Sequence, residues 1–157
     1  MTEDIAKRTM CVGFLFNGRR VLLVNKNKPD WQRGLWNGVG GVIEEEETPI
    51  AGMVREFFEE TKMQTLPGDW RHFATEFEPF GAVVHFYHAD MSPRANHVMP
   101  SCNDVGEALM WCHCDDIYRL KVLGNLSWLI PLARDPRRFT RPLSIEAVGD
   151  IRTVPTW

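Results

Sequence analysis

Three glutamates are spaced so that they could share one metal ion. Glu56, Glu59 and Glu60 lie three and four positions apart, a spacing that places side chains on one face of a helix. Carboxylates at this spacing repel one another, and the repulsion grows when they are partly buried. A hard cation such as Mg²⁺ or Mn²⁺ would relieve it, because these ions prefer oxygen ligands. The cluster therefore indicates either a metal site or an acidic helix face in solvent.

Neighbouring residues could complete such a site. Arg55 lies one turn before Glu59, so its guanidinium could orient that carboxylate through forked hydrogen bonds. Glu47 could add an oxygen ligand or brace Arg55. Gly40 and Gly41 let the backbone come close to a ligand, and the carbonyl of Gly41 could itself bind the metal. The candidate metal ligands are therefore Glu56, Glu59, Glu60 and Gly41.

One helix must position these side chains. Thr48 is suited to cap its first turn, and Pro49 suits the first helical position, where the missing N–H costs nothing. At about 100° per residue, one narrow apolar stripe is formed by Ile50, Met53, Val54, Phe57 and Thr61. The pattern predicts a helix after Thr48 that turns this stripe to the core and carries the glutamates beside it.

The stretch from Gly41 to Met63 resembles the Nudix box, the signature of metal-dependent hydrolases that act on nucleoside diphosphates linked to another group. The glycine, the first glutamate, Arg-Glu, the hydrophobic residue and Glu-Glu are all present. Two positions differ from the pattern. Lys62 replaces the glycine that ends the helix in a left-handed turn, and Glu46 replaces a glycine common before the first glutamate. The differences concern backbone geometry and leave the carboxylates intact.

The Nudix resemblance implies an α/β (α+β) fold, an α/β/α sandwich with a mixed sheet. It also implies hydrolysis of a phosphoanhydride with Mg²⁺, or alternatively Mn²⁺, as cofactor. The implied catalytic residues are Glu56, Glu59, Arg55 and Glu47. The general base stays open between Glu56, Glu59 and a loop carboxylate such as Glu107, which could equally be a solvated strand end.

The residues before the box are similar to one branch of the family, the MutT or 8-oxo-dGTP triphosphatases. In that branch the asparagine matching Asn37 contacts the base, and an amide can donate to and accept from a purine edge. Asn37 could also simply cap its loop. The two aspartates that read the oxidised purine are replaced by Asn125 and Leu126, so we expect a different base preference. The candidate substrate-binding residues are Asn37, Gly40, Lys26 and Asn125.

We therefore expect a nucleotide pyrophosphohydrolase that converts a nucleoside triphosphate, or a modified one, to the monophosphate and pyrophosphate. One alternative is an ADP-ribose or nucleotide-sugar pyrophosphatase. Pro79 lies at the spacing where such enzymes carry a proline, although a hairpin turn explains it better. The other alternative is a Nudix module that binds a nucleotide without turnover.

Composition sets broader limits. The chain has 157 residues, 44% of them hydrophobic, which suits one domain spanning residues 1–157. Its net charge is −3, which disfavours binding to polymeric nucleic acid and leaves a small nucleotide as the expected partner. The apolar stretch 10–16 is too short to cross a membrane. We expect a cytoplasmic protein and leave a homodimer open.

The rest of the pattern predicts strands around the box helix. Strands are expected at Thr9–Phe16 and Arg20–Val24, joined by a turn, and then at Trp70–Phe77, Gly81–Ala89, Glu107–Cys114 and Leu143–Val148. A second helix is expected at Leu123–Arg134, interrupted at Pro131. Alternation along a strand would place Cys112 and Cys114 on one side. Strands interleaved with two helices predict a mixed sheet between helices.

Overall fold

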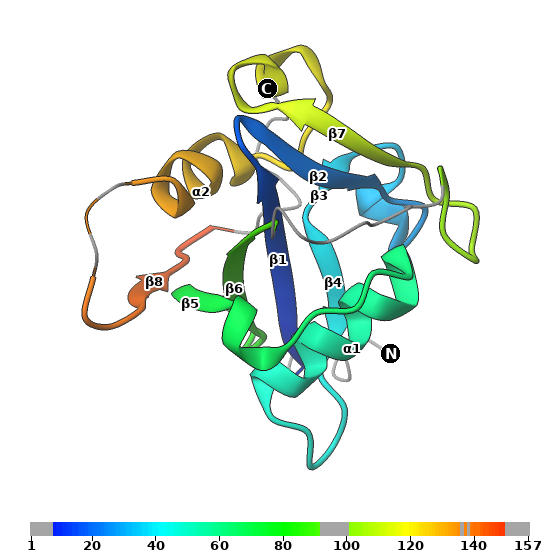
Figure 1. The fold of residues 1–157 in the computed structure, drawn as a ribbon. Coiled ribbons are helices and arrows are strands. Elements are labelled where there is room, and N and C mark those ends of the chain that lie inside the picture. The colour runs from blue at the N-terminus through cyan, green and yellow to red at the C-terminus, as the bar shows by residue number, and fades with distance from the viewer. Residues whose placement is uncertain (1–7, 92–100, 136, 138, 150–157) are drawn as a thin grey trace.

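A computed structural model describes residues 8–91, 101–135, 137 and 139–149. Within these residues the fold is organised around one eight-stranded sheet (Figure 1). The strands are β1 (Thr9–Asn17), β2 (Arg20–Asn25), β3 (Trp36–Asn37), β4 (Val39–Val42), β5 (Arg71–Phe77), β6 (Val83–Asp90), β7 (Leu109–His113) and β8 (Leu143–Glu146).

The sheet is mixed, as the sequence predicts. Its main order is β3-β2-β1-β6-β5-β8, with β4 pairing with β1 and β7 pairing with β2. The pairs β1–β6 and β5–β8 are parallel, and the other pairs are antiparallel. Because β1 lies at the centre, its register aligns the box strand β4 with β6.

Two α-helices cover opposite faces of the sheet. Helix α1 (Pro49–Thr61) packs Met53 and Phe57 into one apolar cluster, and α2 (Leu126–Ala133) packs Leu129 into the other. Strand β1 serves both clusters, because its alternate residues point to opposite faces: Phe14 belongs to the α2 side and Leu15 to the α1 side. The expected α/β/α sandwich is confirmed. None of the described helices is long and apolar enough to span a membrane.

Helix α1 begins where its sequence predicts and ends in a left-handed cap although Lys62 replaces the box glycine. The hydroxyl of Thr48 accepts a hydrogen bond from the Ala51 N–H at 3.3 Å. Lys62 adopts the left-handed conformation, with φ of 60°, and its N–H donates to the carbonyl of Phe58. Glu46 is also left-handed, with φ of 66°. Both residues that replace box glycines therefore keep a backbone shape that glycine adopts most easily.

The glycine-rich approach to α1 is explained by β1. A Cβ atom on Gly40 would lie 2.0 Å from the carbonyl oxygen of Cys11, and one on Gly38 would lie 2.7 Å from the Val12 side chain. These glycines therefore let β4 and the segment before it lie directly against β1.

The second helix is shorter than predicted. It begins at Leu126 because Val122 bridges to Trp36 and the Leu123 N–H bonds the carbonyl of Trp36, which keeps this segment extended. Pro131 lies inside the helix and does not interrupt it. Cys112 and Cys114 lie on one side, as predicted, because both pack in the apolar cluster on the α2 side of the sheet.

The predicted strand is nevertheless too long, because β7 ends between the two cysteines. Cys112 lies in β7, whereas Cys114 begins a 3₁₀ helix at Cys114–Arg119 and its sulfur lies 3.4 Å from Arg134. The remaining 3₁₀ turns are Asp30–Gln32 and Pro67–Asp69.

Candidate active site

Arg55 is the hub of the carboxylate cluster on α1. Its Nε and Nη2 each lie 2.9 Å from an oxygen of Glu47, which forms a forked ion pair. Its Nη1 donates to Glu56 at 2.8 Å and to Glu59 at 3.3 Å, and Nη2 also reaches the carbonyl of Val42. The hydrogen bonds from Arg55 lower the pKa of Glu47. One guanidinium therefore orients three carboxylates, and Glu47 braces it as the sequence suggested.

Glu56 lies against the backbone of Gly41. A Cβ atom on Gly41 would lie 2.6 Å from the Glu56 carboxyl carbon, so glycine at this position makes room for the carboxylate. The carbonyl oxygen of Gly41 is 3.7 Å from the Cys11 thiol, which can donate to it only weakly. Burial raises the pKa of Glu56. The structure thus brings Glu56 and Gly41 together, as a shared ligand role requires.

Glu60 is buried and incompletely paired. Its Oε1 lies 3.7 Å from the ammonium nitrogen of Lys26, while its Oε2 is buried with no hydrogen-bond partner among the described residues. Burial raises the pKa of Glu60 to about 7. A buried carboxylate oxygen without a partner is costly, and a bound cation would remove that cost. The oxygen donors of Glu56, Glu60 and Gly41 are of the kind that a hard divalent ion prefers, with Glu59 at the exposed margin, although no three acidic side chains of the described residues are gathered tightly enough to hold an ion as they stand.

Lys26 and Glu107 form the inner wall of the cluster. The ammonium group of Lys26 lies 3.2 Å from Glu107, and the Glu107 carboxylate also accepts hydrogen bonds from the Asn27 N–H at 2.8 Å and from Asn103 at 3.0 Å. Burial raises the pKa of Glu107, but these bonds together lower it. Glu107 is only 3% exposed, so its reading as a solvated strand end is wrong.

The local sequence around Glu107 carries no signal for this role. The partner Lys26 lies 81 positions away and is brought close only because β2 pairs with β7. Both oxygens of Glu107 are engaged, so this side chain is held in place. Lys26 lies between two acids and is the cation already present beside Glu60.

Two of the predicted substrate-binding residues, Asn37 and Gly40, contact the protein backbone. The side-chain oxygen of Asn37 accepts from the Gly38 N–H at 2.8 Å, and its nitrogen donates to Gln32 at 3.3 Å. Asn37 is therefore buried with its amide bonded to neighbouring residues, and its contact with a base stays a prediction. Gly40 packs directly against Cys11 of β1.

Asn125 lies on the α2 side of the sheet, apart from the carboxylates on α1. Its amide nitrogen is 3.5 Å from the carboxylate of Glu76, and its amide oxygen is buried without a partner among the described residues. Burial raises the pKa of Glu76. Nothing in the local sequence singles out Glu76, because it is one acidic residue in an ordinary strand.

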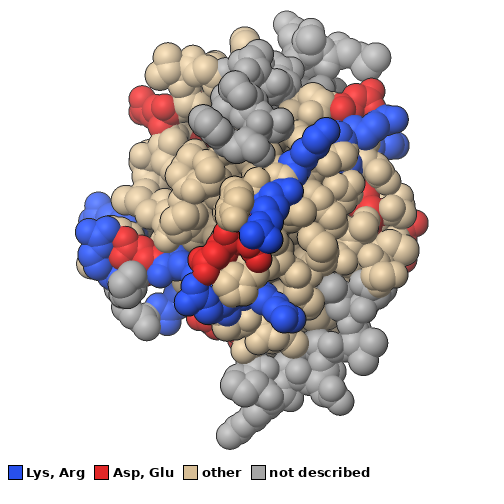
Figure 2. All heavy atoms as spheres, turned by 90° about the horizontal axis from the view of Figure 1, so that it is seen from above, with Lys and Arg blue, Asp and Glu red and all other residues tan. Residues whose placement is uncertain are grey.

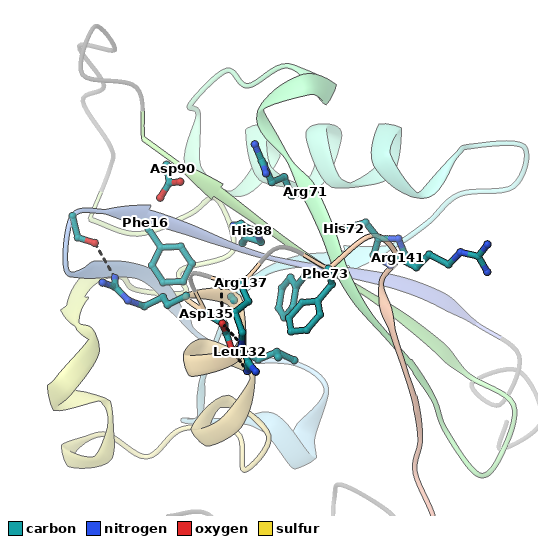
Figure 3. Close-up of a pocket in the computed structure, with 14 residues that line it drawn as sticks. Phe16, Arg71, His72, Phe73, His88, Asp90, Leu132, Asp135, Arg137 and Arg141 are labelled. Atoms are coloured by element: carbon teal, nitrogen blue, oxygen red, sulfur yellow. Dashed lines mark hydrogen bonds and ion pairs between the residues drawn. The ribbon is translucent and has the colours of Figure 1, made fainter.

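A cavity of about 370 Å³ lies elsewhere, between the ends of β1, β5 and β6 and the segment after α2 (Figure 3). Arg137, on its wall, is paired with Asp135, and Arg134 donates to the carbonyl of Gly18. Figure 3 shows Arg71 and Arg141 pointing away from each other, so the two guanidinium groups do not face a common point in the cavity.

Charge on the surface is also mixed. Basic and acidic side chains lie beside one another on the face seen in Figure 2. Exposed ion pairs of this kind include Arg119 with Asp116 at 3.4 Å. The acidic cluster on α1 is therefore set apart by its burial and by its shared arginine.

An α/β/α sandwich with arginine-ordered carboxylates on one helix is the arrangement that the Nudix resemblance implies, and comparison with known families tests that resemblance. Residues 6–131 match the model of the NUDIX domain. The chain therefore belongs to the Nudix family, and the matched residues include the box, helix α1, strands β1 to β7 and most of α2.

Solved structures share the fold at low sequence identity. A MutT protein from Bacillus halodurans is 18% identical with a TM-score of 0.68, over 88% of this chain and 89% of that one. The NUDIX domain of Shewanella oneidensis NrtR, solved with ADP ribose, is 23% identical with a TM-score of 0.64, over 82% and 87%. A bifunctional NMN adenylyltransferase/ADP ribose pyrophosphatase from Francisella tularensis, with AMP and manganese, is 16% identical with a TM-score of 0.61, over 80% and 40%. Identities this low establish the fold and leave the substrate open.

Proposed function

We propose that the protein is a Mg²⁺-dependent hydrolase that cleaves a phosphoanhydride bond of a nucleoside triphosphate or modified nucleotide, giving the monophosphate and pyrophosphate. The observation that carries the proposal is the buried Oε2 of Glu60, which has no hydrogen-bond partner in the described part of the chain and lies beside carboxylates ordered by Arg55. Nudix hydrolases generally use Mg²⁺ or Mn²⁺, and the oxygen donors here suit either ion.

The residues of the site have separable roles in this proposal. A divalent ion held by Glu56, Glu59, Glu60 and the Gly41 carbonyl would supply positive charge for the phosphate oxygens and acidify a bound water. Arg55 keeps Glu56 and Glu59 oriented, and Glu47 keeps Arg55 in its plane. Lys26 contributes a positive charge at the inner wall, where phosphate oxygens of the substrate would be attracted.

The base would be read on the α2 side of the sheet. Asn125 has a buried amide oxygen with no hydrogen-bond partner among the described residues, and burial raises the pKa of the neighbouring Glu76 carboxyl group. Together the amide and the carboxyl group present hydrogen-bonding atoms suited to the edge of a base. This pair differs from the two aspartates of the oxidised-purine branch, so we propose a base other than 8-oxoguanine.

A second candidate is hydrolysis of ADP-ribose or a nucleotide sugar. The specific observation in its favour is that two of the similar structures involve ADP ribose: the NrtR domain was solved with it, and the bifunctional enzyme is an ADP ribose pyrophosphatase. Pro79 adds no support, since it lies in the turn between β5 and β6. A module that binds nucleotide without turnover would have no need of the full carboxylate set.

The test is product analysis across a nucleotide panel with Mg²⁺ or Mn²⁺. The panel contains normal and oxidised triphosphates, ADP-ribose and nucleotide sugars, and ³¹P NMR identifies each product. Pyrophosphate from triphosphates supports the proposal, whereas AMP and ribose phosphate from ADP-ribose alone would replace it with the second candidate. Nucleotide binding without any product would leave only the binding module.

Two variants tie turnover to the carboxylates. Glu59→Gln and Glu60→Gln remove a ligand charge at nearly constant volume and should abolish turnover with the fold retained. Glu45→Gln, on an exposed neighbour in the same acidic turn, is the matched control and should keep wild-type rates.

A further inference from the structure

Three polar side chains converge on the α1 side of β5 and β6, away from the carboxylate cluster. The Nδ1 atom of His85 lies 3.3 Å from the Nε2 atom of His72. The hydroxyl of Thr75 lies 2.8 Å from the same His72 nitrogen and 3.5 Å from the His85 nitrogen. Two nitrogens and one oxygen thus form a small triangle on the sheet surface.

A β-bulge creates this triangle. Residues three apart on a regular strand point to opposite faces, so His72 and Thr75 should not meet. The pairing of β5 with β6 shifts register between His72 and Ala74, which puts His72 opposite Tyr87 and Thr75 opposite His85. Bulges often serve to re-aim a side chain. Here the bulge brings both β5 side chains onto the face of His85.

The His72 ring is fixed by its neighbours, and burial favours the neutral form of both imidazoles. His72 stacks on Tyr87 with ring centroids 4.9 Å apart, and its ring also makes a hydrogen bond to the Ala74 backbone. Burial lowers the pKa of both His72 and His85. A neutral imidazole has a lone pair free, and a second bond that fixes the ring is the usual support for a metal-binding histidine.

We propose that His72 Nε2, His85 Nδ1 and Thr75 Oγ1 form a binding site for a divalent transition-metal ion, with Zn²⁺ as the expected occupant. Zn–N bonds of about 2.0–2.1 Å place two tetrahedral ligands about 3.4 Å apart, close to the spacing of the two nitrogens. Imidazole suits Zn²⁺, Cu²⁺ and Ni²⁺ and is a poor ligand for Mg²⁺. No third His, Cys, Asp or Glu joins the pair among the described residues, so water completes the coordination.

The site is distinct from the proposed hydrolase centre and independent of it. In the sheet register Cys11 of β1 lies between Gly41 on one side and His85 on the other, so one strand separates the two sites. The donors also differ in kind, oxygen at Gly41 and nitrogen at His85. Each site should therefore select its own metal.

The experiment titrates Zn²⁺ into the full chain after EDTA treatment, with Mg²⁺ at saturation to fill the oxygen site. Calorimetry measures stoichiometry and affinity, and ¹H–¹⁵N correlation spectra of the histidine rings identify the nitrogens that respond. We expect one zinc per chain and shifts at His72 Nε2 and His85 Nδ1. His72→Gln and His85→Gln should each weaken binding more than tenfold, and Thr75→Val should weaken it severalfold.

His88→Gln is the matched control, because His88 lies on β6 but points to the opposite face, edge-on to Phe73. It should bind zinc as the wild type does. Zinc should also raise the melting temperature of the wild type and of this control but not of His85→Gln, with all proteins checked for fold without metal. Zinc binding that survives both His72→Gln and His85→Gln, that is lost in Glu60→Gln instead, or that never shifts the ring nitrogens would overturn the proposal.

Discussion

Arg55 and Glu47 face each other through two parallel hydrogen bonds, Nε to Oε1 and Nη2 to Oε2, each 2.9 Å long. The fork fixes the plane of the guanidinium, and the remaining Nη1 reaches Glu56 and Glu59 from that plane. The pair raises the pKa of Arg55 and lowers that of Glu47, so both stay charged across the physiological range. The two residues therefore act as one positioning unit for the carboxylates.

Replacing Arg55 by lysine should lower kcat/KM by about 10- to 100-fold, the range typical when support for metal ligands is lost. A lysine keeps the charge but cannot make the fork. Steady-state hydrolysis of the best substrate measures the loss. Arg119→Lys, in an exposed ion pair with Asp116, should leave the rate unchanged. Wild-type turnover by the Arg55 variant would contradict the positioning role.

Gly41→Ala should damage both metal binding and stability. The added methyl would lie 2.6 Å from the Glu56 carboxylate, so that side chain must move away. Overpacking of this kind costs about 1–3 kcal/mol of unfolding free energy. Denaturant unfolding and Mn²⁺ titration measure the two effects. Gly68→Ala has open space around the new methyl and should behave like the wild type; equal behaviour of both variants would refute the contact.

The titration of Glu60 should make the metal-free protein less stable as the pH rises. Its pKa is about 7 in the folded state against an ordinary 4.5, so between these values the folded chain holds a proton that the unfolded chain has released. Unfolding free energy should therefore fall with rising pH, by up to about 1.4 kcal/mol per pH unit from this group. Glu60→Gln should remove that slope.

Denaturant unfolding in EDTA at several pH values between 5 and 7 measures this slope, and the difference between wild type and variant isolates Glu60. His72, His85 and His88 titrate with the opposite sign, because their pKa values are lowered by burial, but they contribute equally to both proteins. Parallel curves for the two proteins would show that Glu60 keeps its ordinary pKa.

Lys62→Gly should change the unfolding free energy by less than about 1 kcal/mol. Glycine relieves the left-handed backbone, but it gains freedom in the unfolded chain and loses the bonds from Lys62 to Asp104 and the Glu59 carbonyl. Lys62→Val should be less stable than Lys62→Gly by about 1–3 kcal/mol, because a β-branched residue resists positive φ. Thermal and denaturant unfolding of Lys62→Gly and Lys62→Val measure this difference in stability. Equal stability would mean that the helix end has changed its conformation.

Much of the fold and the carboxylate cluster could be predicted because their signals are local. The spacing of Glu56, Glu59 and Glu60, the cap at Thr48 and the apolar stripe of α1 all depend on residues within one or two helical turns. The main strands could be predicted for the same reason, because each is a short run of apolar residues between turn residues. The start of α2 could not be predicted, since it depends on Trp36 holding Val122 and Leu123 in an extended segment.

The sequence by itself determined the family, the mixed sheet between helices and the arginine-ordered carboxylates, because short-range spacing controls each of them. Only the tertiary structure decided which distant groups meet. Strand pairing of β2 with β7 places Glu107 beside Lys26, and a one-residue bulge in β5 turns His72 and Thr75 toward His85. Such contacts depend on register across strands, and a change of register by one residue reverses the face to which every side chain points.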